Sequence, residues 1–89
     1  MEITAVKVRK TCREARLRAI VSVTIDGAFA VHDIKIIEGP DRIFVAMPSR
    51  RDEAGQYRDI CHPITAEARR DLEVRVLAAY EAHLQREEG

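Results

Sequence analysis

The spacing of apolar residues changes once along this chain of 89 residues, near Pro63. Before Pro63 the apolar positions recur about every second residue, which is typical of strands, and after it about every 3.6 residues, which is typical of a helix. The pattern therefore predicts an α+β fold: an antiparallel sheet of about five strands over residues 2–60 and one long C-terminal helix over residues 65–86, packed on the sheet. No repeat or linker interrupts the pattern, so we expect residues 1–89 to form a single domain.

The dipeptide Asp26-Gly27 is the clearest local signal. It suits a two-residue type I′ hairpin turn, because both central residues of that turn adopt positive φ. Such a turn sets the register of the flanking strands and places their apolar residues on one side of the pleat. The expected cross-strand pairs are Ile25–Ala28, Val23–Ala30, Val21–His32, Ala19–Ile34 and Leu17–Ile36.

Shorter apolar runs predict the other strands. The first is expected at Glu2–Lys10, with a bulge where the apolar phase slips between Ile3 and Val6. Two short strands and the loop that joins them are expected at Arg42–Met47, Tyr57–Ile60 and Ser49–Gln56.

The helix is expected to begin after Thr65, whose hydroxyl can accept a hydrogen bond from a free backbone N–H of the first turn. Glu67 lies in that first turn, where the helix dipole favours a negative charge. We expect the apolar stripe of the helix to pack on the sheet face that carries Leu17, Val21 and Ile34, and Arg86–Gly89 to fray. The stripe consists of Leu72, Val76, Leu77, Tyr80 and Leu84.

Composition narrows the class of protein only slightly. Fifteen basic and fifteen acidic side chains cancel, so the net charge gives no indication of a nucleic-acid partner. Cys12 and Cys61 are too few and too far apart for a disulfide framework or a zinc ribbon, and we expect two reduced thiols in a cytoplasmic protein. The N-terminus lacks the pattern of a signal peptide, and no apolar run approaches the ~20 residues that span a bilayer. We therefore expect no membrane partner.

Several segments carry a recognisable pattern: Arg18-Ala19-Ile20 before the Asp26-Gly27 turn, then Ala30–Ile34, Phe44–Arg51 and Tyr57–Ile64. Together they resemble the signature of the SpoVG family (stage V sporulation protein G). The resemblance runs from Met1 to about Tyr80 with its spacing intact. The Phe-Val-Ala-Met-Pro-Ser and Arg-Asp-Ile-x-His-Pro-Ile segments are its most specific parts.

The resemblance implies a small, cytoplasmic, non-enzymatic bacterial protein with a sheet and one helix. It implies a homodimer that binds DNA, and in some members RNA, and that regulates gene expression in connection with septation and sporulation. Members often carry a longer acidic tail than Arg86–Gly89, so a function that rests on that tail is not implied here. The small core and exposed strand edges of this chain also favour a dimer.

Basic side chains are unevenly distributed. Residues 1–18 carry a local charge of +4 and residues 26–41 a local charge of −3, so a neutral chain can still present a basic face. For Lys7–Arg13 within the first segment, ordinary solvated strands are an equal alternative. The basic residues of the first segment are Lys7, Arg9, Lys10, Arg13, Arg16 and Arg18.

Five arginines are the candidate nucleic-acid contacts. Arg50, Arg51 and Arg58 flank a loop from which guanidinium groups can reach phosphates, although Asp52 and Glu53 directly follow. Basic residues at the Arg50 and Arg51 positions are also implied by the resemblance. Arg69 and Arg70 lie in the first turns of the helix, where free N–H groups favour phosphate. The alternatives are an ordinary solvated loop and a helix surface stabilised by pairs such as Asp71 with Arg75.

We interpret the remaining polar residues as stabilising the fold rather than binding a ligand. We expect His32 to be a hydrogen-bonded core histidine and Asp33 to form a cross-strand ion pair with Arg18. Cys61 and His62 are adjacent and should point to opposite faces, so His62 should not activate the thiol but anchor the turn into the helix. No metal-ligand spacing or catalytic constellation is present, and we expect no cofactor, no metal and no enzymatic activity.

Two functions stay open from the sequence. The first is a dimeric nucleic-acid-binding regulator whose contacts are made mainly to the phosphate backbone, because the few aromatic residues form no stacking platform. The second is a protein–protein adaptor in septation without direct nucleic-acid binding. It would use exposed strand edges and a mixed face that carries Ile20, Phe29 and Val31.

Overall fold

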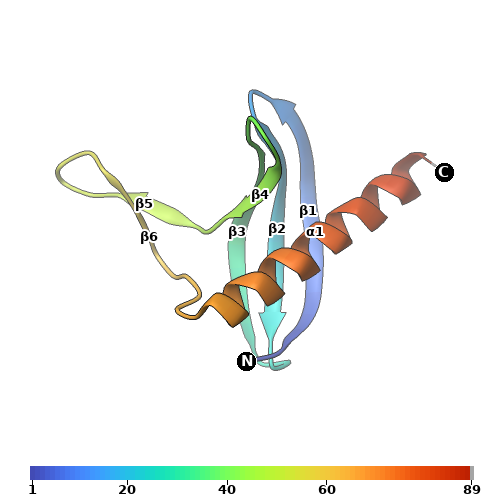
Figure 1. Cartoon of the computed structure of the whole chain (residues 1–89), viewed down its shortest axis with the longest axis horizontal. Helices are drawn as coiled ribbons and strands as arrows, with labels where there is room; N and C mark the ends of the chain where they lie inside the picture. The colour runs from blue at the N-terminus through green and yellow to red at the C-terminus, as the bar shows by residue number, and fades with distance from the viewer. Residues whose placement is uncertain (89) are drawn as a thin grey trace.

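The computed structural model describes residues 1–88, and its elements are shown in Figure 1. Strands precede one C-terminal helix, so the fold is α+β, as predicted, with six strands where about five were expected. Their bounds are β1 Ile3–Glu14, β2 Leu17–Ile25, β3 Phe29–Glu38, β4 Ile43–Ala46, β5 Ser49–Arg51, β6 Tyr57–Asp59 and α1 Ala66–Glu88.

The strands form two sheets and not the single five-stranded sheet expected from the sequence. β1–β4 make an antiparallel sheet in chain order, and β5 pairs only with β6. Figure 1 shows the β5–β6 hairpin projecting from the β4 side of the main sheet. Its ends are joined by a hydrogen bond of 2.8 Å from the Ile60 N–H to the Pro48 carbonyl. We call this hairpin the arm. The expected loop at 49–56 is therefore partly strand.

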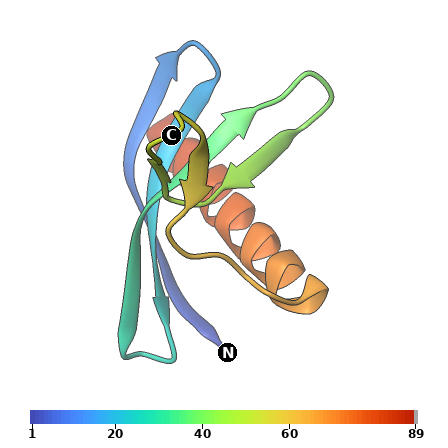
Figure 2. The same cartoon turned by 90° about the vertical axis from the view of Figure 1, so that its left-hand side faces the viewer.

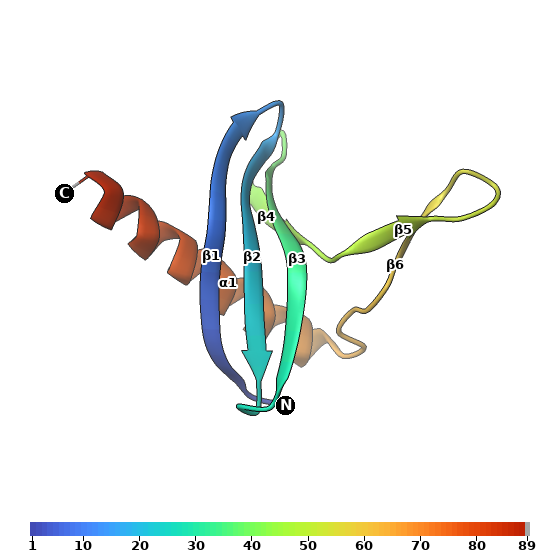
Figure 3. The same cartoon turned by 180° about the vertical axis from the view of Figure 1, so that it is seen from behind.

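Helix α1 covers one face of the main sheet and leaves the other face open. Figure 2 shows the helix on one side of the twisted sheet, and in Figure 3 β1, β2 and β3 lie in front of it. The core forms between the sheet and the helix, as the apolar stripe predicts. It consists of Ile3, Ala19, Val21, Val23, Ile34, Ile36, Val45, Leu72, Val76 and Tyr80, with Leu77 and Leu84 packed at its margin.

The turn between β2 and β3 differs from the predicted one. Ile25 pairs with Phe29, so the loop has three residues rather than two. Asp26 and Gly27 both adopt positive φ, as expected, but β1 also holds them in place. The Asp26 N–H donates to the Glu2 carbonyl at 2.7 Å, and the Gly27 N–H donates to Thr4 Oγ1 at 2.9 Å. Glu2 and Thr4, at the start of the chain, thus hold the backbone of the three-residue loop.

A bulge in β3 then shifts the register again. Val23 pairs with Val31 but Val21 pairs with Ile34, and Asp33 in the extra stretch has a φ of 63°. The predicted pairing of Ala19 with Ile34 is therefore wrong. Because a one-residue slip moves a side chain to the other face, His32 is exposed, whereas Ile34 remains in the core.

Strand β1 is longer than expected and is irregular. The predicted slip near Ile3 is confirmed by a register shift between Ile3 and Ala5. A shift in β2 between Leu17 and Ala19 turns Leu17 toward the open face, where it pairs with Ile37. Leu17 is therefore not on the face that packs against the helix, contrary to the prediction.

The start of α1 is as predicted. Thr65 Oγ1 accepts a hydrogen bond of 3.0 Å from the Ala68 N–H, which satisfies one of the free donors of the first turn. The helix continues to Glu88, so the fraying expected from Arg86 is not seen as far as residue 88, and Gly89 lies outside the described residues. No helix in the described part of the chain is long and apolar enough to cross a membrane.

Candidate nucleic-acid interface

The arm is shaped by the carboxylate of Asp52 at the end of β5. Asp52 Oδ1 accepts hydrogen bonds of 2.9 Å from the N–H groups of both Ala54 and Gln56. Its own N–H donates to the Gln56 carbonyl at 2.8 Å, and Gly55 closes the turn with a φ of 84°. Such side-chain bonds to nearby backbone groups are why Asp is favoured in turns. One carboxylate thus fixes the tip that presents the arginines.

The cross-strand register of the arm divides its arginines between two faces. Arg50 lies directly opposite Arg58, and Arg51 lies opposite Tyr57. Because partners across a strand pair point to the same side, Arg50 and Arg58 share one face and Arg51 takes the other. The guanidinium of Arg51 reaches back over the turn, since a Cβ at Gly55 would lie 3.5 Å from its Nη2.

Only one of these three arginines is held by a carboxylate. Arg58 Nε donates to Asp52 Oδ2 at 2.8 Å, and this hydrogen bond is the main reason that the pKa of Asp52 lies below its ordinary value. Among residues 1–87, Arg50 and Arg51 form no ion pair, and both are exposed. Arg50 and Arg51 are therefore available to a ligand. The neutralisation expected from Asp52 affects Arg58.

The arm also encloses a shallow hollow of about 400 Å³. Its lining alternates positive and negative groups with one apolar side chain, so it is not a uniformly basic pocket. The lining residues are Arg50, Arg51, Asp52, Glu53, Arg58, Asp59 and Ile60.

Arg69 and Arg70 lie in the first two turns of α1 and are exposed. Neither forms an ion pair with a carboxylate of residues 1–87, whereas Arg75 pairs with Asp71 at 3.3 Å, as the helix-surface alternative predicts. Figure 1 shows the arm and the start of α1 as separate parts of the chain, joined by residues 60–65. Arg50, Arg51 and Arg58 therefore lie on the arm, and Arg69 and Arg70 lie on the helix.

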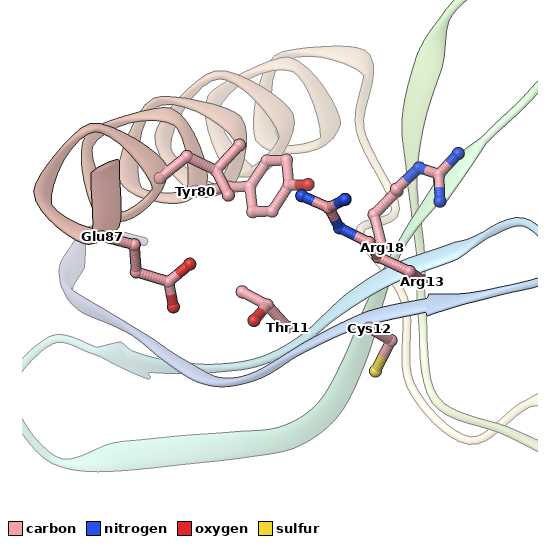
Figure 4. A pocket seen from close by; sticks show the side chains of 7 residues that line it. Thr11, Cys12, Arg13, Arg18, Tyr80 and Glu87 are labelled. Atoms are coloured by element: carbon pink, nitrogen blue, oxygen red, sulfur yellow. The ribbon is translucent and has the colours of Figure 1, made fainter.

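The structure contains a second hollow that the sequence did not indicate, of about 590 Å³ between β1, β2 and the later turns of α1. Figure 4 shows the arginines on one side of it and the Glu87 carboxylate on the other. Arg18 is bound by Glu38 at 2.8 Å, and this hydrogen bond raises the pKa of the Arg18 guanidinium. The predicted ion pair of Arg18 with Asp33 is wrong, because the bulge at Asp33 and the shift at Arg18 separate them. Arg13, Tyr80, Thr11, Cys12 and Leu84 complete the lining.

His32 is hydrogen-bonded as predicted, but on the open face rather than in the core. Its Nδ1 lies 2.8 Å from Ser22 Oγ, and the same hydroxyl accepts a hydrogen bond of 3.2 Å from Arg9 Nε. Ser22 is buried beneath these two longer side chains. The three residues form a polar bridge between β1, β2 and β3 that the sequence did not indicate.

His62 supports the connection into the helix, as the sequence predicted. Its Nδ1 donates to the Pro63 carbonyl at 3.0 Å, and no hydrogen bond joins it to Cys61 in the described part of the chain. Both cysteines are free and half-buried. Within residues 1–88 no three His, Cys, Asp or Glu side chains gather as metal ligands.

The fold and the site define a small α+β protein with a projecting arginine-bearing arm. The SpoVG family model matches residues 1–82. A Heliobacterium modesticaldum protein is 57% identical over 84 residues, which is 94% of each chain. A Lachnospira eligens protein is 56% identical over 81 residues, which is 91% of this chain and 92% of its relative. Both relatives carry the name "Putative septation protein SpoVG". The chain belongs to the SpoVG family, as the sequence motifs predicted.

Proposed function

We propose that this protein is a dimeric nucleic-acid-binding regulator connected with septation and sporulation. Family membership supports the cellular role, because the relatives are named as septation proteins. The observation that carries the binding activity is the arm: Arg50 and Arg51 project from the body, are exposed, and lack a carboxylate partner among residues 1–87. Exposed guanidinium groups without a carboxylate partner can bind phosphate through two parallel hydrogen bonds.

Arg58, Arg69 and Arg70 have different parts in this proposal. Arg58 is held by Asp52 and mainly orients the arm, although its exposed guanidinium keeps further donors for a phosphate. Arg69 and Arg70 form a second contact next to the helix N-terminus, whose dipole favours anions. Binding of this kind depends on the phosphate backbone and is therefore sensitive to salt.

The experiment is a fluorescence-anisotropy titration of labelled DNA and RNA with the wild type and with Arg50→Gln/Arg51→Gln. We expect the double variant to lose at least about tenfold in affinity at 100 mM salt, because each lost phosphate contact removes part of the counterion release. A matched control is Arg42→Gln/Arg75→Gln, which removes the same charge from arginines that already face Glu73 and Asp71. Equal affinity of the arm variant and the control would contradict the proposal.

The dimer in this proposal is supported by apolar side chains that the single chain leaves uncovered. Phe29 and Ile60 are each 67% exposed, Tyr57 is 73% exposed and Ile64 is 87% exposed. An isolated two-stranded hairpin is at best marginally stable in water, so the arm benefits from a partner surface. Light scattering at micromolar concentration should give twice the chain mass of 10.1 kDa, and a strict monomer would contradict this part of the proposal.

A second candidate function is a septation adaptor that binds another protein. The observation that favours it is an apolar cleft of about 160 Å³ that includes Phe29, Val31 and Met47. The mixed face first expected for this role does not form, because Val31 packs toward the core while Ile20 lies on the open face. Phe29→Ser should abolish capture of a defined protein partner, whereas Arg50→Gln/Arg51→Gln should leave that capture unchanged. The opposite pattern would exclude the adaptor.

A further inference from the structure

The open face of the main sheet carries a group of cations that the arm does not include. Val6 and Val8 pack against the core, so Lys7 between them points to the open face. Lys35 lies between the buried Ile34 and Ile36 and points the same way. The register sets Lys10 opposite Ile20, and Ile20 opposite Lys35. One cross-strand row therefore runs from Lys10 over Ile20 to Lys35.

Arg9 belongs to the same face and is held in position. Its Nε donates to Ser22 Oγ, which lies on the open face because Val21 and Val23 on either side are buried. This hydrogen bond engages only Nε, so the two terminal nitrogens remain as donors for a ligand. The bond to Ser22, which also contacts His32, restricts the side chain before any ligand arrives.

The charges of this face are not compensated. None of Lys7, Arg9, Lys10 and Lys35 forms an ion pair with a carboxylate of residues 1–87. By contrast, Arg18, Arg42, Arg58 and Arg75 on other surfaces each face a carboxylate within 4 Å. Glu14, at the far end of β1, and Asp33, in the bulge, pair with none of the four cations.

The distribution of lysine separates this face from the rest of the molecule. The chain has twelve arginines but only three lysines, and the lysines are Lys7, Lys10 and Lys35. All three fall on the open face, and Lys10 and Lys35 lie two strand spacings apart, about 10 Å. A solvated face needs no such concentration of unpaired positive charge, and like charges in one row repel one another unless an anion joins them.

We propose that the open face of β1–β3 is a second nucleic-acid surface, on which Lys7, Arg9, Lys10 and Lys35 contact the sugar–phosphate backbone. The inference rests on the proposed function and adds a site to it. The half-buried Ile20 in the cationic row offers an apolar floor for sugars. No exposed aromatic ring lies in that row, so the contact is to the backbone and independent of base sequence.

Lysine-specific acetylation tests this proposal directly, because every lysine of the chain is on the proposed surface. The protein would be treated with an acetylating ester alone, with single-stranded oligothymidylate, and with duplex DNA, and each site followed by mass spectrometry. We expect the acetylation of all three lysines to slow at least fivefold in a saturated complex, while the amine of Met1 reacts at an unchanged rate. The two DNA forms show which backbone the face prefers.

A variant series completes the test. Lys7→Gln/Lys10→Gln/Lys35→Gln should lower the slope of log affinity against log salt by about 2 to 3, and Lys7→Arg/Lys10→Arg/Lys35→Arg should restore it. Unchanged acetylation rates and an unchanged slope, with the wild type still binding through Arg50 and Arg51, would overturn this inference and leave the proposed function intact. A wild type that binds neither DNA form nor RNA would overturn both.

Discussion

Ile34→Val is the substitution that best tests the register of the sheet. Ile34 is fully buried under α1, whereas Ile37 in the same strand is half-buried on the open face. Removing one methylene from a well-packed core costs about 0.8 kcal/mol in transfer free energy, and the cavity brings the total to about 1 kcal/mol. Ile37→Val removes the same group, and we expect it to cost less than about 0.5 kcal/mol.

Urea unfolding followed by circular dichroism would measure both variants at one protein concentration, because a dimer's stability depends on concentration. With a slope of about 1 kcal/mol/M for a chain of this size, Ile34→Val should lower the midpoint by about 1 M and leave the slope unchanged. Equal midpoint shifts in the two variants would refute the assignment of Ile34 and Ile37 to opposite faces.

Three further predictions concern local structure. Thr65→Ala should cost about 1 kcal/mol in unfolding free energy while Thr65→Ser costs much less, because serine keeps the capping oxygen; equal losses would exclude the cap. The pKa of Asp52 is lowered in the folded protein, chiefly by the hydrogen bond from Arg58. Ionised Asp52 therefore stabilises the arm fully above its ordinary pKa of 3.8. This stabilisation disappears as the pH falls through the lowered pKa of the folded protein. The amide NMR signals of Ala54 and Gln56, whose N–H groups donate to Asp52, should therefore change in acid in the wild type and much less in Asp52→Asn. Gly55→Ala should destabilise the arm by about 1–2 kcal/mol, because Gly55 has positive φ, and unchanged amide exchange in the arm would contradict this.

Local patterns predicted those parts of the fold that depend on neighbouring residues. The helix and its Thr65 cap follow from an apolar stripe and a capping residue. The positive φ at Asp26 and Gly27 follows from the preferences of the two residue types. The slip after Ile3 was visible as a change of apolar phase. Each of these signals is contained within a few residues of the sequence.

The predictions that are wrong concern loops and pairings whose geometry depends on segments distant in the sequence. The hairpin loop has three residues, and Glu2 and Thr4 bind its backbone; nothing near Asp26 in the sequence reveals those contacts. No glycine in the sequence indicates the bulge at Asp33, and this bulge removes His32 from the core. Arg18 finds Glu38 instead of Asp33 for the same reason.

In the candidate site, too, the residue types could be read from the sequence, but their pairing could not. The sequence named all five arginines as candidates, but their charge alone could not distinguish Arg58, which Asp52 binds, from Arg50, which has no carboxylate partner among residues 1–87. That distinction depends on the turn made by Asp52, whose side chain organises the tip of the arm. The open-face cations were visible as a basic segment, but only the register places Lys35 of β3 beside them.

Phosphate binding by the arm is tested most directly by NMR observation of the arginine Nε–Hε groups while DNA or RNA is added. We expect the signals of Arg50 and Arg51 to shift first and to saturate together with the binding measured by anisotropy, while the signal of Arg75, which is paired with Asp71, stays in place. Saturation of binding with the Arg50 and Arg51 signals unmoved would contradict the claim that the arm contacts phosphate.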